Sequence, residues 1–313
     1  MLKITIIGLF LLFNIQPTMA QETFTEEELT INNFVDGTLA IPAEGTASSL
    51  VILIQGSGPT DRNSNQPMMK NDALKKMAHR LAEEGIASFR YDKRIMKIGQ
   101  SELKEKDLRF TNFVEDANTV LDYFRKNEEY ERIIVAGHSQ GSLVGMLAAN
   151  NKADAFISLA GAGRSIDDII TEQIGNQLPE LKEGTRAALD EIKQKGSTTS
   201  YHPFLESMFR ADVQPFLASW IQFDPALEVA KLEIPILIIN GTSDVQMNVK
   251  EAELLKEAKP DSEMAIIDNM NHVFREIQGN DQLANSKSYN EPNRPLHPEL
   301  IPIMIDFIRN LEK

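Results

Sequence analysis

The sequence contains no cysteine among its 313 residues. A disulfide, a thiolate nucleophile and a cysteine-ligated zinc site are therefore excluded, and we expect no lipid anchor on an N-terminal cysteine. The H-E-x-x-H motif of zinc enzymes is absent too, and we expect neither a metal nor a cofactor. With 42% apolar residues, a chain of this length can bury a core large enough to fold without cross-links.

Basic residues are scarcer than acidic ones. The chain has 32 Lys and Arg against 46 Asp and Glu, a formal net charge of −14. A surface with this excess of negative charge repels nucleic acid phosphates and anionic membranes. We therefore expect neither of them as a partner.

Long apolar runs are missing after residue 20, so no membrane span is expected in the mature chain. Residues 1–20 have the pattern of a secretory signal peptide: Lys3 is their one charge, residues 4–13 are apolar, and small residues end at Ala20. The alternative is a buried N-terminal strand. We expect cleavage near Ala20 and a soluble periplasmic or secreted protein. Its net charge is −15, because 31 basic and 46 acidic residues remain.

Short apolar runs alternate with amphipathic segments over most of the chain. This alternation predicts βαβ units and a mostly parallel central sheet flanked by helices. The expected strands are residues 29–33 and 37–41, which form a hairpin, and 50–55, 86–91, 133–136, 155–159, 235–240 and 264–267. The expected helices of the sheet domain are residues 77–84, 113–127 and 142–150.

The strand pattern stops between Gly163 and Ala230. Residues 166–177 and 183–195 are helix-like, and an aromatic-rich piece follows. We expect residues 163–230 to form a helical cap over the sheet, inserted between the two parts of a catalytic domain at 21–162 and 231–313. A second lobe without a role in binding is the alternative. Most of the cap aromatics are expected in the core, and three are candidates for an acyl pocket: Phe209, Phe216 and Trp220.

A single G-x-S-x-G pattern, Gly137-His138-Ser139-Gln140-Gly141, lies between an expected strand and an expected helix. That is the context of a nucleophile elbow, in which a strained turn presents the serine Oγ at the carboxyl edge of the sheet. The two glycines relieve steric clashes in such a turn. Ser139 is therefore the candidate nucleophile, and a purely structural tight turn is the alternative.

A serine nucleophile needs a base, and the base needs an acid. Of the five histidines, His272 follows the last expected strand and fits the chain order Ser, acid, His; His138 is set aside because its side chain points away from the Oγ of Ser139. Asp244 follows the strand at 235–240 and is the candidate acid. The alternatives are an N-cap role for Asp244 and a surface position for His272, with Asp268 as second choice for the acid.

An oxyanion hole requires two N–H donors. The backbone N–H of Gln140 is one candidate, because it directly follows the nucleophile. The N–H of Ser57 is the other, since it lies in the glycine-containing loop after the strand at 50–55. A phosphate cradle is the alternative for this loop, but the sequence has neither G-x-x-x-x-G-K nor G-x-G-x-x-G.

The combination of these motifs resembles the α/β-hydrolase superfamily over nearly all of residues 29–312, and in particular bacterial EstD-type carboxylesterases and their serine-aminopeptidase-like relatives. The motifs are Gln55-Gly56-Ser57-Gly58-Pro59-Thr60-Asp61-Arg62, Arg90-Tyr91-Asp92-Lys93-Arg94, the pentapeptide around Ser139, Gly241-Thr242-Ser243-Asp244 and Asn271-His272. The resemblance implies the same triad and oxyanion hole, and a cap that shapes the substrate site. A long polar loop at residues 278–294 departs from the family pattern. Four charged residues are expected as ion-pair partners near the site, with substrate binding as the alternative: Asp61, Arg62, Asp92 and Arg94.

Together these features predict an exported serine hydrolase that cleaves carboxylic esters with short to medium acyl chains through an acyl-enzyme on Ser139. A small-molecule ester is the expected partner. A peptidase, a thioesterase or an acyltransferase would use the same residues, and a protein that only binds ligands under the cap is the alternative of another class.

Overall fold

The computed structural model describes residues 23–43, 47–99, 102–279 and 281–311. The predicted signal peptide at 1–20 lies outside the described residues. None of the helices in the described ranges combines the length and the apolar character that crossing a membrane requires.

One eight-stranded sheet, with strand order β1-β2-β4-β3-β5-β6-β7-β8, forms the centre of the molecule. The strands are β1 (Phe24–Thr30), β2 (Asp36–Pro42), β3 (Ser49–Ile54), β4 (Ala87–Tyr91), β5 (Arg132–His138), β6 (Ala155–Leu159), β7 (Ile236–Gly241) and β8 (Glu263–Ile267). β1 and β2 form an antiparallel hairpin, and β2 pairs antiparallel with β4. All other neighbours are parallel. The predicted mostly parallel sheet is confirmed, although β1 begins five residues earlier than expected.

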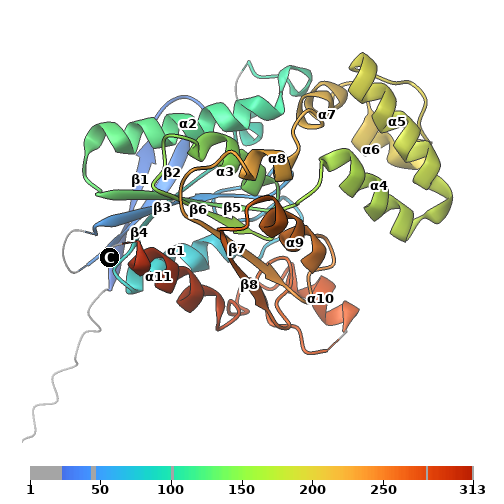
Figure 1. Ribbon diagram of the computed structural model, residues 1–313. Helices are drawn as coiled ribbons and strands as arrows, with labels where there is room; N and C mark the ends of the chain where they lie inside the picture. The colour runs from blue at the N-terminus through green and yellow to red at the C-terminus, as the bar shows by residue number, and fades with distance from the viewer. Residues whose placement is uncertain (1–22, 44–46, 100–101, 280, 312–313) are drawn as a thin grey trace, which may run out of the picture.

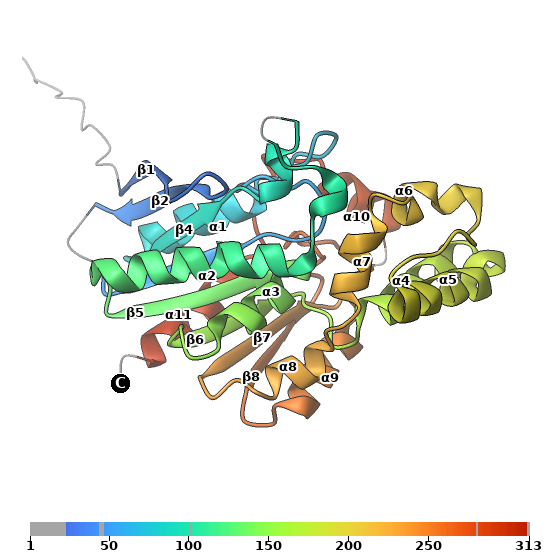
Figure 2. The ribbon, with the colours of Figure 1, turned by 90° about the horizontal axis from the view of Figure 1, so that it is seen from above.

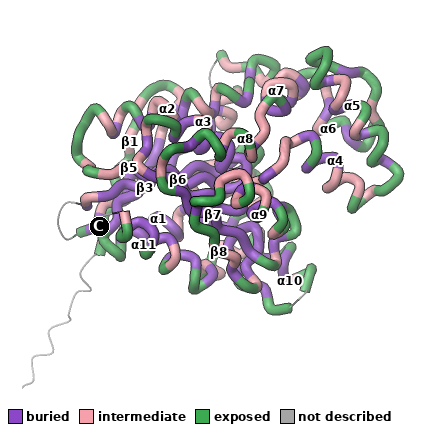
Figure 3. The backbone as a smooth tube through the Cα atoms, viewed as in Figure 1, coloured by how far each residue is buried: buried purple, intermediate pink, exposed green. Residues whose placement is uncertain are grey.

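Helices cover both faces of the sheet, as Figures 1 and 2 show. α1 (Ala73–Glu83) and α11 (Leu300–Asn310) pack on one face, and α2 (Phe110–Asn127), α3 (Gln140–Ala149) and α9 (Val249–Ala258) pack on the other. β3 shows why both faces need cover. Leu50 and Ile52 join the core under α2 and α3, while Val51 and Leu53 join the core under α1 and α11. The central strands are buried on both sides for this reason, and Figure 3 shows the exposed positions on the outer surfaces.

The chain between β6 and β7 is helical and projects to one side of the sheet. It contains α4 (Ile166–Gln177), α5 (Lys182–Lys195), α6 (Glu206–Phe209), α7 (Gln214–Trp220) and α8 (Pro225–Val229). Helices α4 to α7 enclose a small core of their own, to which Leu189, Ile192 and Phe209 contribute. α8 instead packs against α3 and α9 of the sheet domain. Of the predicted cap at 163–230, helices α4 to α7 share this core, and α8 packs with the sheet domain.

The cap is fixed to the sheet domain at both of its ends. Where it begins, the fully buried carboxylate of Glu251 on α9 accepts hydrogen bonds from the backbone N–H of Gly163 (3.0 Å) and from the Nε of Arg164 (2.9 Å). Where it ends, the Trp220 ring of α7 stacks on the Phe110 ring of α2 with centroids 5.4 Å apart. An ion pair and an aromatic stack therefore set the position of the cap relative to the sheet.

Candidate active site

Ser139 is the single residue between β5, which ends at His138, and α3, which begins at Gln140. Its backbone has φ 53° and ψ −118°, a conformation that costs free energy in a non-glycine residue and that tends to occur at functional sites. The N–H of Ser139 donates to the carbonyl of Leu159 on β6 at 2.9 Å. The neighbouring strand thus holds the turn in its strained form.

Two glycines make this turn possible. A Cβ on Gly137 would lie 2.1 Å from the carbonyl oxygen of Gly141, and a Cβ on Gly141 would lie 2.5 Å from the carbonyl oxygen of Ile54 on β3. Both distances are far inside van der Waals contact, so only glycine permits this approach of strand, turn and helix. The strand–turn–helix context that the sequence predicts around Ser139 is present.

Asp244 and His272 form a buried hydrogen-bonded pair. The Nδ1 of His272 donates to the Oδ2 of Asp244 at 2.7 Å, and both residues are at most 5% exposed. The other carboxylate oxygen, Oδ1, accepts from the backbone N–H groups of Gln246 and Met247, both at 2.8 Å. The carboxylate is therefore fixed by its own loop after β7, and the imidazole presents Nε2 as its remaining nitrogen.

The alternatives for this pair find no support in the geometry. Asp268 is exposed, and the Nδ1 of His272 bonds Asp244 instead. The N-cap of α9 is Asn248, whose side chain accepts from the N–H of Lys250. Asp244 is thus not the helix cap, and His272 is not a surface residue. Ser139 and His272 line the same hollow, which we call the histidine-side hollow, of about 380 Å³.

His138 has a role that the sequence did not reveal. Its Nε2 donates to the backbone carbonyl of His272 at 2.9 Å, and its ring lies 4.7 Å from the His272 ring and 4.8 Å from the Phe274 ring. Burial and the neighbouring His272 lower the pKa of His138 well below its usual value, which keeps it neutral at physiological pH. His138 therefore supports the loop that carries His272.

The polar loop at 278–294 supports the same turn from the other side. It contains α10 (Gln282–Ser288), where Asn285 and Ser288 accept hydrogen bonds at 2.9 and 2.8 Å from the side chain of Asn271, the residue before His272. This departure from the family pattern thus braces the histidine and does not displace it.

Ser57 and Gln140, the candidate oxyanion donors, lie on two loops that border one cavity. Both line a hollow of about 450 Å³ between sheet domain and cap, together with Ser139. Ser57 lies in the loop after β3, where Gly58 has φ 88°. Ser57 and Ser139 also line the histidine-side hollow. Ser139 therefore lies where that hollow meets the cavity under the cap.

Lys93 connects these two loops. It follows β4, is 5% exposed, and donates through Nζ to the carbonyl of Gly56 (2.7 Å) and to the Oε1 of Gln140 (2.6 Å). The Nζ also lies 4.5 Å from the centre of the Phe113 ring. Burial lowers the pKa of Lys93 from 10.5 to about 7. The sequence showed Lys93 only as part of a charged run just after a strand, a weak signal for a residue at the carboxyl edge.

The cavity under the cap is mainly apolar. The apolar residues that line it are Ile95, Leu108, Phe113, Ile166, Ile169, Ile170, Met208, Val213, Phe216, Leu217, Trp220 and Met247. Phe216 and Trp220, two of the three candidates for the acyl pocket, lie in this wall. Phe209 is not: it is fully buried inside the cap, where it stacks on Tyr201, and it is absent from the cavity wall. Its aromatic ring serves the core of the cap.

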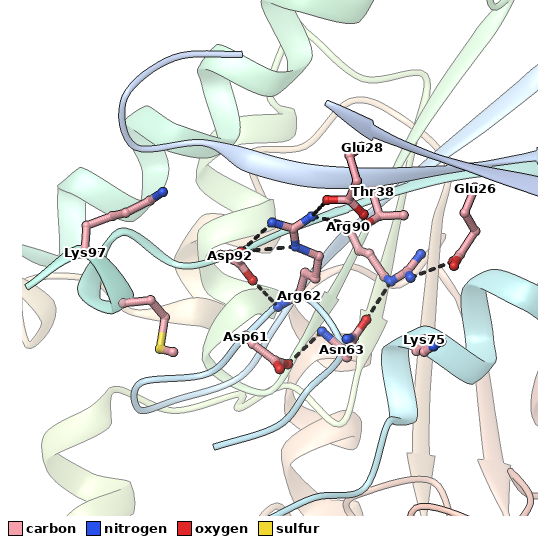
Figure 4. A pocket seen from close by; sticks show the side chains of 11 residues that line it. Glu26, Glu28, Thr38, Asp61, Arg62, Asn63, Lys75, Arg90, Asp92 and Lys97 are labelled. Atoms are coloured by element: carbon pink, nitrogen blue, oxygen red, sulfur yellow. Dashed lines mark hydrogen bonds and ion pairs between the residues drawn. The ribbon is translucent and has the colours of Figure 1, made fainter. Parts of the chain in front are cut away.

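The charged residues near β4 line a separate polar cavity of about 510 Å³, shown in Figure 4. Arg62 donates to Asp92 at 2.6 Å, and Arg94 donates to Asp116 of α2 at 2.6 Å. Asp61 has no ion-pair partner in the part of the chain that the structure describes; its Oδ1 accepts from the backbone N–H groups of Asn63 and Asn65. Arg94 does not line this cavity, and neither Ser139 nor His272 is among the described residues that do. The bonds of Arg62 to Asp92 and of Asp61 to the backbone of its own loop support the loop after β3.

Comparison with known proteins gives the same architecture. Residues 70–196 match the family model described as serine aminopeptidase, S33. The structure aligns over 90% of this chain and 99% of that chain with Est1E of Butyrivibrio proteoclasticus bound to ferulic acid, with a TM-score of 0.57 and 19% identity. It aligns over 92% and 90% with the Pyrococcus furiosus esterase Pf2001, with a TM-score of 0.52 and 14% identity. The chain has the α/β-hydrolase fold.

Within this fold, the sequence is 28% identical over 269 residues to esterase EstD of Thermotoga maritima, a match that covers 82% of this chain. The chain spans about 62% of the length of that relative. These comparisons confirm the α/β-hydrolase fold that the sequence predicts. They also confirm that the sequence is similar to an EstD-type esterase.

Substituting Gly137 tests the packing of the elbow. We expect Gly137→Ala to lower the free energy of unfolding by about 3 kcal/mol or more, because its Cβ meets backbone atoms that cannot move aside. Gly184→Ala is the matched control: Gly184 is exposed on α5 with no atom within 4 Å of a built Cβ, and the change should stabilise by up to about 1 kcal/mol. Urea unfolding of both variants gives the comparison, and equal stability of the two contradicts the prediction.

Proposed function

We propose that this protein is a serine hydrolase that cleaves carboxylic esters, with Ser139 as nucleophile, His272 as base and Asp244 as the acid that orients it. The observation that carries the proposal is the 2.7 Å bond between His272 and Asp244 beside a strained serine at a strand–helix elbow. The two backbone N–H groups that donate to Asp244 hold its carboxylate in the orientation that bonds His272.

The chemistry is a two-step acyl transfer. The Oγ of Ser139 attacks the ester carbonyl carbon while the Nε2 of His272 accepts its proton. The carbonyl oxygen becomes negative and accepts hydrogen bonds from the N–H groups of Ser57 and Gln140. The protonated His272 then gives its proton to the leaving alcohol as the ester C–O bond breaks. Water, deprotonated by His272, releases the acid from Ser139.

The cavity under the cap is the proposed acyl site. Its wall is largely aliphatic and aromatic, and it reaches Ser139 on the side of Gln140. A short to medium aliphatic or a small aromatic acyl group would bury its surface there. Est1E, to which the structure aligns, binds ferulic acid.

An aminopeptidase needs an acidic group for the free ammonium of its substrate. Glu105 is the one carboxylate among the described residues of the cavity wall, and it accepts from Arg210 at 2.7 Å. An ester substrate is favoured because this charge is already neutralised. A thioesterase or an acyltransferase would share the triad. A protein that only binds ligands would not require the strain at Ser139 or a buried acid–base pair.

The leaving alcohol takes its proton from His272 and is therefore expected to occupy the histidine-side hollow. Asp, Glu, Lys and Arg are absent from the described residues that line the histidine-side hollow and the groove beside it between α4 and α10. Amides and hydroxyls are frequent there, among them Gln66, Asn176, Gln177, Gln246 and Tyr289. We propose a neutral, hydroxyl-rich alcohol such as a sugar on this side, since uncharged donors and acceptors match its hydroxyls.

Export is a further proposal. It rests on the sequence of residues 1–20 alone, with one lysine, an apolar run and small residues at Ala20.

Removing the nucleophile gives the first test. Ser139→Ala should hydrolyse p-nitrophenyl acetate and butyrate at least about 10³-fold more slowly than the unchanged protein. A fluorophosphonate probe should form an adduct on Ser139 of the unchanged protein and none on the variant, as measured by mass spectrometry. Full residual activity of Ser139→Ala contradicts the proposal. If the unchanged protein shows neither an adduct nor ester turnover, a role in ligand binding is favoured.

The acid is tested by a matched pair of substitutions. Asp244→Asn keeps Oδ1 as an acceptor for the loop N–H groups but donates towards Nδ1, so it favours the wrong tautomer of His272 and should lower kcat about 10⁴-fold. Asp268→Asn, on the exposed second candidate, should leave kcat within about twofold. A large loss for Asp268→Asn with a small one for Asp244→Asn would reverse the assignment.

A panel of esters tests the two sides of the site. For one fixed alcohol, kcat/KM should rise from acetyl to butyryl or hexanoyl as the cavity under the cap fills. For one fixed acyl group, sugar esters should be cleaved with a higher kcat/KM than choline or amino-acid esters of the same acid. Preference for a cationic alcohol overturns the leaving-group proposal but leaves the ester activity intact.

A further inference from the structure

We propose that Lys93 is a positioning residue of the oxyanion hole, which holds both donor loops with one ammonium group and places its positive charge beside the oxygen that becomes negative. This inference rests on the proposed ester hydrolysis. It concerns a side chain that lies outside the triad and that neither donates nor accepts the transferred proton.

The contacts of Nζ give the positioning part. Gly56 directly precedes Ser57, and Gln140 directly follows Ser139, so the two acceptors of Lys93 belong to the two loops that carry the proposed oxyanion donors. Both bonds are short, at 2.7 and 2.6 Å, and buried. One group therefore fixes the separation of two loops that are far apart in sequence. Preorganised donors of this kind are a large part of the stabilisation of an acyl-transfer transition state.

The charge of Lys93 has no carboxylate partner within 4.0 Å among the described residues. Asp116 of α2 lines a small cavity together with Lys93, but Arg94 holds it through two bonds of 2.8 and 2.6 Å. Glu105 is paired with Arg210. A buried cation without a counterion is costly, and an oxyanion between the two loops would supply the missing negative charge.

The remaining titratable groups around Lys93 carry no charge that could replace a partner. Burial raises the pKa of Tyr91 on β4 above its usual range and lowers that of His138 on β5 below it, so both are neutral near pH 7. The ring of His272, the proposed base, lies beyond His138, with the two ring centroids 4.7 Å apart. Unlike Tyr91 and His138, Lys93 can change its charge close to pH 7, because burial lowers its pKa to about 7.

Deprotonation and substitution remove different parts of this role. An amine that has lost one proton keeps two N–H donors, enough for both Gly56 and Gln140, but loses its charge. Replacement by Met loses donors and charge together. The alkaline limb of the pH profile thus reports the charge, and Lys93→Met reports the sum of charge and positioning.

The experiment measures kcat and KM for p-nitrophenyl butyrate between about pH 5 and pH 10. Activity of the unchanged protein should fall on the alkaline side of this range, because Lys93 loses its proton there. Lys93→Met should lower kcat about 10²- to 10³-fold, change KM less than about threefold, and lack the alkaline fall. Lys93→Arg keeps a charge that does not titrate in this range; it should recover part of kcat and also lack the fall. Lys126→Met, on an exposed lysine near the end of α2, should behave as the unchanged protein.

Thermal unfolding separates this role from a purely structural one. Lys93→Met should have a Tm equal to or above that of the unchanged protein at pH 6, because a buried charge is removed. A kcat within about threefold of the unchanged protein, or an alkaline fall that persists in Lys93→Met, overturns the inference while ester hydrolysis stands. If Lys93→Met does not fold, Lys93→Arg decides: an alkaline fall of activity that persists in this variant overturns the inference. Absence of ester turnover in the unchanged protein contradicts the proposed function itself.

Discussion

The proposed chemistry depends on one steric constraint, the close approach of the turn at Ser139 to β3 and to its own helix. Gly137 and Gly141 remove the Cβ atoms that would otherwise meet backbone at 2.1 and 2.5 Å. Because these positions lack a Cβ, strand, turn and helix can approach closely enough for Ser139 to have φ 53° between β5 and α3. The neighbouring strand β6 holds the strained turn, because the N–H of Ser139 donates to the carbonyl of Leu159.

The parallel sheet also explains how distant residues meet. Loops that follow β3, β4, β5, β7 and β8 leave the sheet at the same edge and carry, in that order, Ser57, Lys93, Ser139, Asp244 and His272. Each side chain needs only a short loop to reach its place. Further contacts link them to one another: Lys93 after β4 bonds Gly56 after the neighbouring β3, and His138 at the end of β5 bonds His272 after β8, three strands further along the sheet.

The strands, the elbow and the Asp244–His272 pair were accessible from sequence because each has a local signal: an apolar run, a glycine pattern or a place after a strand. β1 was expected too short, since its first half reads Phe-Thr-Glu-Glu and is exposed at the sheet edge. Phe209 was misplaced, because aromatic character does not reveal whether a ring faces the cavity or the cap core. The contacts of Lys93 and His138 join segments 37 to 134 residues apart, and no local pattern encodes them.

The cap contributes much of the apolar wall of the cavity and carries a core of its own. It joins the sheet domain mainly through the Glu251–Arg164 pair where it begins and through the aromatic contacts of α7 with α2 where it ends. Under the proposed function, the cap residues of this wall would bear on the choice of acyl group, and the triad lies in the sheet domain. Exchange of wall residues such as Met208 or Val213 would reshape the substrate range while the nucleophile, its base and its acid keep their geometry. If the proposed function holds, a change of substrate would need substitutions in the cap wall and none in Ser139, Asp244 or His272.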